Sequence, residues 1–175
     1  GIDILAAADT GGIVTVGDSL TDANISTHDA FCRWPDQLAR RLTARKDGGA
    51  FGVMNQGLGG NRILHDIRGD SGLRRFDRDV LAQPGVTHAV IMLGTNDLRN
   101  RPGKSEEEVV APQMIAGLKQ FALRGRAHGI KVVNGFWLNQ GADYVNDTAY
   151  MDSTLDQIKQ WVTTYRNHPG VLMWD

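Results

Sequence analysis

The sequence predicts a three-layer α/β/α domain of the flavodoxin-like type, with about five parallel strands. Short apolar runs rich in β-branched residues recur along the chain, and amphipathic helical segments lie between them. Strands that alternate with helices form parallel sheets covered on both faces. At 175 residues, with 41% hydrophobic and 22% charged content, the chain fits a single α/β domain over residues 1–175.

Each strand is predicted from an apolar run next to glycine or other turn-forming residues. The first run, at 13–16, is β-branched and bounded by glycines, as expected of a buried parallel strand. The others end in a turn or follow a helix stop. The five predicted strands span residues 13–16, 51–54, 89–93, 131–138 and 171–174.

Three long helices are predicted between these strands. One begins at residue 34 with a proline in its first turn and ends at the glycines 48 and 49. A second is predicted over 105–128, because residues 105–108 have the spacing of a capping box and apolar residues follow at the helical period; Pro112 is expected to kink its start. The third is predicted over 152–166.

Composition narrows the possible partners. Nineteen Lys and Arg residues against 20 Asp and Glu give a net charge of −1, so the basic footprint of a nucleic-acid or anionic-membrane binder is absent. A single cysteine, Cys32, excludes an intramolecular disulfide. No apolar stretch approaches the roughly 20 residues of a membrane span. We therefore expect no nucleic-acid or membrane partner, while the cellular compartment and the oligomeric state stay open.

Three glycine-bearing turns each follow a predicted strand: GDSL at 17–20, NQGLGG at 55–60 and GTND at 94–97. In open parallel sheets, ligands gather at the carboxyl ends of the strands, so these turns are expected to converge. Ser19 would then supply a nucleophile, the Gly60 N–H one oxyanion donor, and the Asn96 side-chain amide another.

Each turn also has a structural interpretation. GDSL alone occurs by chance, Gly59 and Gly60 could merely turn the chain, and Asn96 with Asp97 could cap a helix. Because all three follow strands, their combination favours a catalytic site.

In order and spacing, the three turns resemble the first three motif blocks of SGNH (GDSL) hydrolases, over about residues 12–130. The resemblance implies that Ser19 is the nucleophile and that Gly60 and Asn96 complete the oxyanion hole. Such enzymes hydrolyse acetyl and other acyl esters of carbohydrates, lipids and small molecules, and are often secreted. The resemblance therefore implies a class of reaction and no particular substrate; the expected partner of an active chain is a small-molecule or carbohydrate ester.

The chain departs from that family where the general base is expected. The family's last block is Asp-x-x-His, and this sequence contains none. Only His168 lies late enough in the chain, and the residue three positions before it is Tyr165. His168 could act as the base, but His168 and Pro169 fit a helix stop better. The sequence thus predicts an esterase scaffold with an incomplete catalytic triad.

A second resemblance covers residues 129–175, which are similar to a β/α unit of a glycosidase-type (β/α)₈ barrel. This resemblance raises the alternative of a recombined or engineered chimera with no evolved activity. A natural hydrolase with a divergent C-terminus and a truncated chain are further possibilities.

A carboxylate metal site is conceivable from the acidic residues in and near these turns, but it is not the expected outcome. The five histidines have no i, i+3 or i, i+4 pairing. We therefore expect neither a metal nor a cofactor. The acidic residues concerned are Asp18, Asp22, Asp66 and Asp97.

Overall fold

A computed structural model describes residues 10–23, 25–45, 50–98, 109–135 and 147–165. Four parallel strands form one sheet in the order β2-β1-β3-β4, which is the flavodoxin-like order. The predicted parallel α/β fold is confirmed, with four strands in the described residues. The strands are β1 (Gly11–Gly17), β2 (Phe51–Gly57), β3 (Val86–Met92) and β4 (Lys131–Asn134).

The described strands differ from the predicted ones mainly at their ends. β1 to β3 are each longer than the apolar runs that predicted them, because their polar or glycine ends continue the pairing. The fourth predicted strand is described as far as Asn134, and the fifth, at 171–174, lies outside the described residues.

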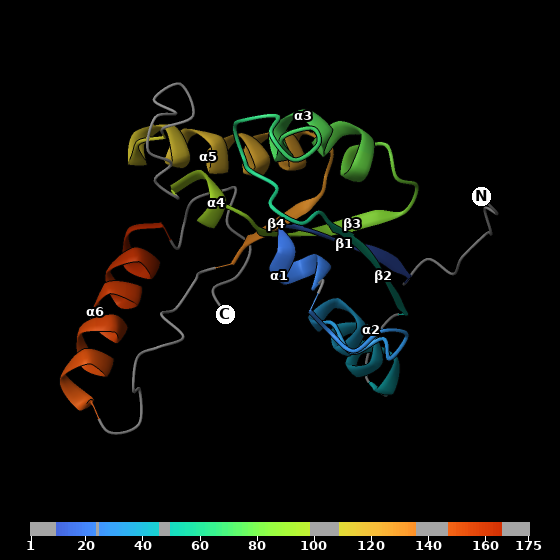
Figure 1. Ribbon diagram of the computed structural model, residues 1–175, viewed down its shortest axis with the longest axis horizontal. Helices are drawn as coiled ribbons and strands as arrows, with labels where there is room; N and C mark the ends of the chain where they lie inside the picture. The colour runs from blue at the N-terminus through green and yellow to red at the C-terminus, as the bar shows by residue number, and fades with distance from the viewer. Residues whose placement is uncertain (1–9, 24, 46–49, 99–108, 136–146, 166–175) are drawn as a thin grey trace.

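Helices cover both faces of the sheet (Figure 1). α3 (Gly72–Phe76), the π-helical turn η1 (Asp77–Leu81) and α5 (Ala111–Ala127) lie on one face. The short α1 (Ser19–Asp22) and α2 (Trp34–Ala44) lie on the other, and α6 (Thr148–Tyr165) stands to one side. Among the described helices, none is both long and apolar enough to cross a bilayer.

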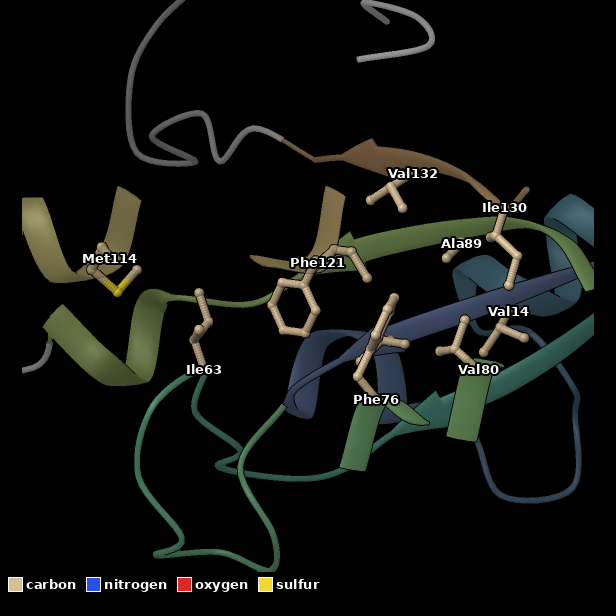
Figure 2. Close-up of a cluster of buried hydrophobic side chains, with 11 residues drawn as sticks. Val14, Ile63, Phe76, Val80, Ala89, Met114, Phe121, Ile130 and Val132 are labelled. Carbon is tan, nitrogen blue, oxygen red and sulfur yellow. The ribbon is translucent and has the colours of Figure 1, made fainter. Parts of the chain in front are cut away.

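The core lies between the sheet and the α3–α5 layer (Figure 2). Alternate residues of β1 and β3 point into it, as the two-residue period of a strand requires. At its centre the rings of Phe76 and Phe121 meet edge to face, with centroids 5.0 Å apart. The buried members of the cluster are Val14, Val16, Ile63, Phe76, Val80, Ala89, Ile91, Met114, Phe121, Ile130 and Val132.

The predicted start of the second long helix was wrong. α5 begins at Ala111, and the capping-box residues 105–108 lie outside the described residues. Pro112 therefore occupies the first turn, where its missing N–H costs no hydrogen bond, and does not kink a helix already under way. α2 likewise ends at Ala44, ahead of the predicted glycine stop.

Candidate active site

The three glycine-bearing turns meet at the carboxyl edge of the sheet, as predicted. Ser19 opens α1 directly after β1, Gly60 lies in the turn after β2, and Asn96 lies in α4 (Thr95–Leu98) after β3. Hydrogen bonds join the turns. The Asn96 Nδ2 donates to Asp18 Oδ2 in the first turn and to the Asn61 carbonyl in the second, each at 3.1 Å.

Ser19 is held at the start of a helix that its neighbour caps. Asp18 has extended backbone geometry and is 2% exposed, and its Oδ1 accepts the Leu20 N–H at 3.0 Å. Ser19 itself is half-buried. Within the described part of the chain, no residue hydrogen-bonds to its hydroxyl.

α1 is tied to β2 by a side chain from that strand. Asn55 Nδ2 donates to the Thr21 carbonyl at 3.1 Å, while Asn55 Oδ1 accepts the Gly57 N–H at 2.8 Å. From the other side, Trp34 Nε1 donates to Thr21 Oγ1 at 3.2 Å. These contacts fix α1 against the strand end that leads to Gly60.

Gly60 has the backbone geometry that the turn requires of glycine. Its φ is +75°, which lies in the left-handed region, and the Asn61 N–H closes the turn onto the Leu58 carbonyl at 3.0 Å. No acceptor among the described residues takes the Gly60 N–H. The turn therefore leaves one backbone donor open, as an oxyanion hole needs.

Unlike the Gly60 N–H, the Asn96 side-chain amide already has hydrogen-bond acceptors. Both hydrogens of its side-chain amide are already donated, one to the Asp18 carboxylate and one to the Asn61 carbonyl. A developing oxyanion would have to share or displace one of these acceptors.

Asp97 ties the third turn to the second. Its carboxylate is 2% exposed and accepts the Ile63 N–H on both oxygens, at 2.8 and 3.0 Å, and the Leu64 N–H at 3.1 Å. Burial raises the pKa of Asp97, although these N–H groups act in the opposite direction. Asp97 thus holds the segment after Gly60, a role the sequence analysis did not assign to it.

Three of the four acidic residues near the turns, Asp18, Asp66 and Asp97, have structural partners. Asp18 and Asp97 accept the bonds described above, and Asp66 Oδ1 accepts the Ser71 N–H at 2.7 Å. Within the described ranges, no group of three or more His, Cys, Asp or Glu side chains could hold a metal ion.

His168, the candidate base, lies outside the described residues. The described histidines are not bonded to Ser19. His28 pairs with Asp29 in an exposed loop, His88 contacts Thr87 Oγ1 at 2.8 Å, and the His128 ring contacts the Arg124 carbonyl at 3.0 Å.

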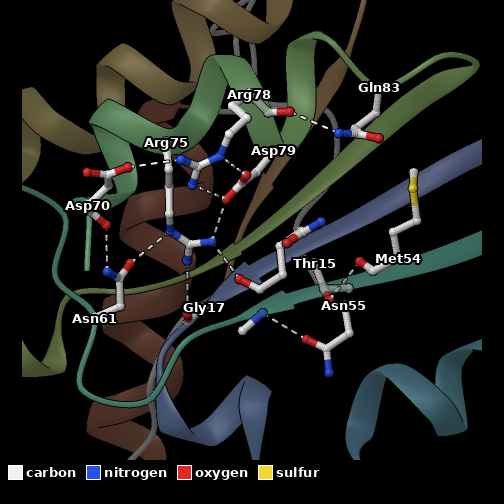
Figure 3. Close-up of polar contacts among 12 residues, drawn as sticks. Thr15, Gly17, Met54, Asn55, Asn61, Asp70, Arg75, Arg78, Asp79 and Gln83 are labelled. Atoms are coloured by element: carbon white, nitrogen blue, oxygen red, sulfur yellow. Dashed lines mark hydrogen bonds and ion pairs between the residues drawn. The ribbon is translucent and has the colours of Figure 1, made fainter. Parts of the chain in front are cut away.

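A buried arginine beneath the turns was missed by the sequence analysis (Figure 3). The guanidinium of Arg75, 3% exposed, lies among the carboxyl ends of β1 and β2. The sequence carries little sign of it, because arginine is usually exposed. Its acceptors are the Gly17 carbonyl (3.2 Å), the Gln56 carbonyl (2.8 Å), Asn61 Oδ1 (3.1 Å) and Asp79 Oδ2 (3.0 Å).

Asp79 balances the Arg75 charge. Burial alone would raise the pKa of Asp79, but hydrogen bonds from Arg78 and Arg75 outweigh burial, so its pKa lies below the usual value. A carboxyl of this kind adds stability above its unfolded pKa of about 4, and the contribution is lost as the pH falls through its folded pKa.

Asp79→Asn is therefore expected to lower the free energy of unfolding at pH 7 by about 2 kcal/mol, since it leaves a buried cation with a neutral partner. The difference from wild type should shrink as the pH falls below about 4. Urea unfolding across this pH range measures it. A difference that stays constant down to low pH would show that the Asp79 charge adds no stability.

Residues 15–175 match the profile of the GDSL-like Lipase/Acylhydrolase family. Solved structures share the fold at low identity. AlinE4, an SGNH-hydrolase family esterase, aligns with a TM-score of 0.58 and 18% identity over 97% of this chain and 86% of its own. A histidine-to-alanine catalytic mutant of Axe2, an acetylxylan esterase from Geobacillus stearothermophilus, aligns with a TM-score of 0.66 and 20% identity, over 94% of this chain and 75% of its own.

TesA aligns with a TM-score of 0.57 and 22% identity, over 89% of this chain and 74% of its own. No curated protein sequence matches the chain. The structural likenesses establish the fold of SGNH hydrolases, and the family match extends over most of the sequence. The chain belongs to the GDSL-like lipase/acylhydrolase family.

Proposed function

We propose that this chain carries an SGNH-type serine esterase site with Ser19 as the nucleophile. The observation that carries the proposal is the convergence of the three turns. The Ser19 hydroxyl and the Gly60 N–H, which have no hydrogen-bond partner among the described residues, lie on the same sheet edge as the Asn96 amide. Ser19 Oγ attacks the acyl carbonyl. The oxyanion is stabilised by the Gly60 N–H and by the Asn96 amide, in which it shares or displaces one of the present acceptors. The alcohol then leaves, and water releases the acid.

The proposed turnover is weak. No Asp-x-x-His sequence is present to take the serine proton, and the remaining candidate for that role is His168. Solved structures of Axe2 catalytic mutants replace an aspartate in one case and a histidine in another, which supports the importance of such residues in that enzyme. Oxyanion stabilisation and binding alone sustain roughly 10³-fold catalysis over water in well-studied serine enzymes.

The proposed substrates are acyl esters of small alcohols or of carbohydrates. Support comes from the family match and from Axe2, which is described as an acetylxylan esterase. No metal or cofactor takes part in the proposed chemistry.

The test is acylation of the purified chain by a chromogenic acetyl ester, followed by intact mass and by release of the chromophore. We expect acetylation at Ser19 that Ser19→Ala abolishes. Ser153→Ala is the matched control, because Ser153 is exposed on α6 and its hydroxyl donates to the Tyr150 carbonyl at 2.9 Å. A wild-type rate no higher than that of Ser19→Ala would overturn the proposal.

His168→Ala distinguishes acylation with His168 as the general base from acylation without a base. A loss as large as that of Ser19→Ala assigns His168 as the base, and an unchanged rate means that acylation proceeds without it. The alternative of a chimera without activity predicts a folded chain that is not acylated at Ser19. The support for the chimera is the similarity of residues 129–175 to a barrel unit. The family match covers the same segment and therefore weighs against the chimera.

A further inference from the structure

Arg75 makes more hydrogen bonds to the candidate site than the burial of its charge requires. A buried guanidinium needs a counter-charge, and Asp79 supplies one through a 3.0 Å bond. The remaining donors reach separate segments near the proposed nucleophile and oxyanion donors, namely the ends of β1 and β2 and the turn after β2. Figure 3 shows the side chain extending from α3 between these segments.

Arg75 binds two backbone carbonyls at the carboxyl ends of β1 and β2. Gly17, the last residue of β1, comes two residues before Ser19, and its carbonyl accepts Arg75 Nη2 at 3.2 Å. Gln56 is the second-to-last residue of β2, and its carbonyl accepts Nη1 at 2.8 Å. The Leu58 N–H also donates to the Gly17 carbonyl at 3.0 Å, which brings the two strand ends together under one cation.

The third contact reaches both oxyanion donors through Asn61. Arg75 Nε donates to Asn61 Oδ1 at 3.1 Å, and the Asn61 side chain is fixed further by donating to the Arg68 and Asp70 carbonyls. Asn61 directly follows Gly60, and its carbonyl accepts the Asn96 amide. Asn61 therefore links Arg75 to Asn96 through one hydrogen bond to its side chain and one to its backbone carbonyl.

We propose that Arg75 is a positioning residue of the esterase site, which sets the spacing between Ser19 and the two oxyanion donors. The inference rests on the proposed function. Arg75 touches no substrate and acts only through the carbonyls and the Asn61 amide that it holds. Its planar fork binds several acceptors in fixed directions, which the single ammonium of lysine cannot reproduce.

Arg75→Lys tests this role because it keeps the charge and loses the fork. Misplacement of reacting groups by about 1 Å costs about 10²-fold in rate, so we expect Ser19 acylation to slow by about that factor with an unchanged half-saturating ester concentration. Val80→Ala is the control for stability. Val80 is fully buried on η1 and belongs to the apolar core, so its truncation destabilises the fold without changing the hydrogen bonds of Arg75.

The rates are compared at a temperature where circular dichroism shows wild type and both variants folded. Slow acylation in Arg75→Lys with a wild-type rate in Val80→Ala supports positioning. Equal rates in all three, or equal losses in both variants, overturn it while leaving the esterase proposal intact. Wild-type acylation no faster than in Ser19→Ala overturns both.

Asn61→Ala provides a second route if Arg75→Lys does not fold. It removes the Nε acceptor and the anchors of the second turn while leaving the Arg75 side chain in place. The same slowing at unchanged half-saturation is expected, and a wild-type rate would again overturn the proposal.

Discussion

Gly57→Ala is expected to abolish Ser19 acylation and to destabilise the fold by about 3 kcal/mol, at the upper end of the usual cost of overpacking. A Cβ on Gly57 would lie 2.3 Å from the Asp22 backbone nitrogen and 2.7 Å from the Thr21 carbonyl carbon. Both atoms belong to α1, the helix that Ser19 opens, and backbone cannot rotate out of the way. α1 must therefore move off β2, which carries Ser19 away from the Gly60 turn.

Gly52→Ala is the matched control for that substitution. Gly52 lies on the same strand, and an added Cβ there meets no atom within 4 Å. Replacing glycine within a strand is expected to be neutral or to stabilise by about 0.5 kcal/mol. Urea unfolding and Ser19 acylation of both variants measure the contrast. Similar behaviour of the two would mean that close packing of α1 on β2 is not what positions the serine.

The sequence predicted the sheet because its signals are local. β1 and β3 carry apolar, β-branched runs that are recognisable without knowledge of the fold, and glycine-bearing turns mark their carboxyl ends. The convergence of the turns then follows from parallel pairing alone, since parallel strands end on one edge. This reasoning placed Ser19, Gly60 and Asn96 on the same edge without any side-chain information.

The helical segment of α3 and η1 was not predicted, and the reason is physical. Its sequence is dense in charge, and the apolar residues that pack on the core are separated by charged ones. These apolar residues are Leu73, Phe76, Val80 and Leu81. Arg75 lies on that buried side as well, where a sequence pattern would place an apolar residue. Its burial depends on acceptors from strands and turns far away in the chain, and no local pattern encodes that.

The start of α5 shows a different limit of prediction from sequence. Residues 105–108 have the composition of a capping box, but the described helix begins at Ala111, with the Val110 N–H donating to Gln113 Oε1 at 3.0 Å. Proline in the first turn and this hydrogen bond favour the later start. Two competing start signals within a few residues cannot be ranked from local sequence alone.

Asp97→Ala is expected to lower the free energy of unfolding by about 4 kcal/mol, because it leaves the Ile63 and Leu64 N–H groups without their acceptor at a buried position, at about 1–3 kcal/mol for each group. Ile63 is itself fully buried and belongs to the core, so water cannot easily replace the carboxylate there. The segment after Gly60 would lose its bonds to the Asp97 carboxylate and keep only the bond from Asn96 to the Asn61 carbonyl among its described hydrogen bonds to α4. We therefore expect Ser19 acylation to fall in the folded protein.

Asp66→Ala separates the effect of burial from the loss of a carboxylate. Asp66 also accepts a backbone N–H, from Ser71 at 2.7 Å. Ser71 is buried but the Asp66 side chain is exposed, so water can enter the place of the removed carboxylate and accept this N–H. Its loss is expected to cost about 1 kcal/mol or less, with no change in acylation. Equal losses of stability in the two variants, measured by urea unfolding, would show that burial of the Asp97 carboxylate is not what makes it indispensable to the turn. A larger loss in Asp97→Ala, together with slower acylation, would identify this carboxylate as the support of the Gly60 turn.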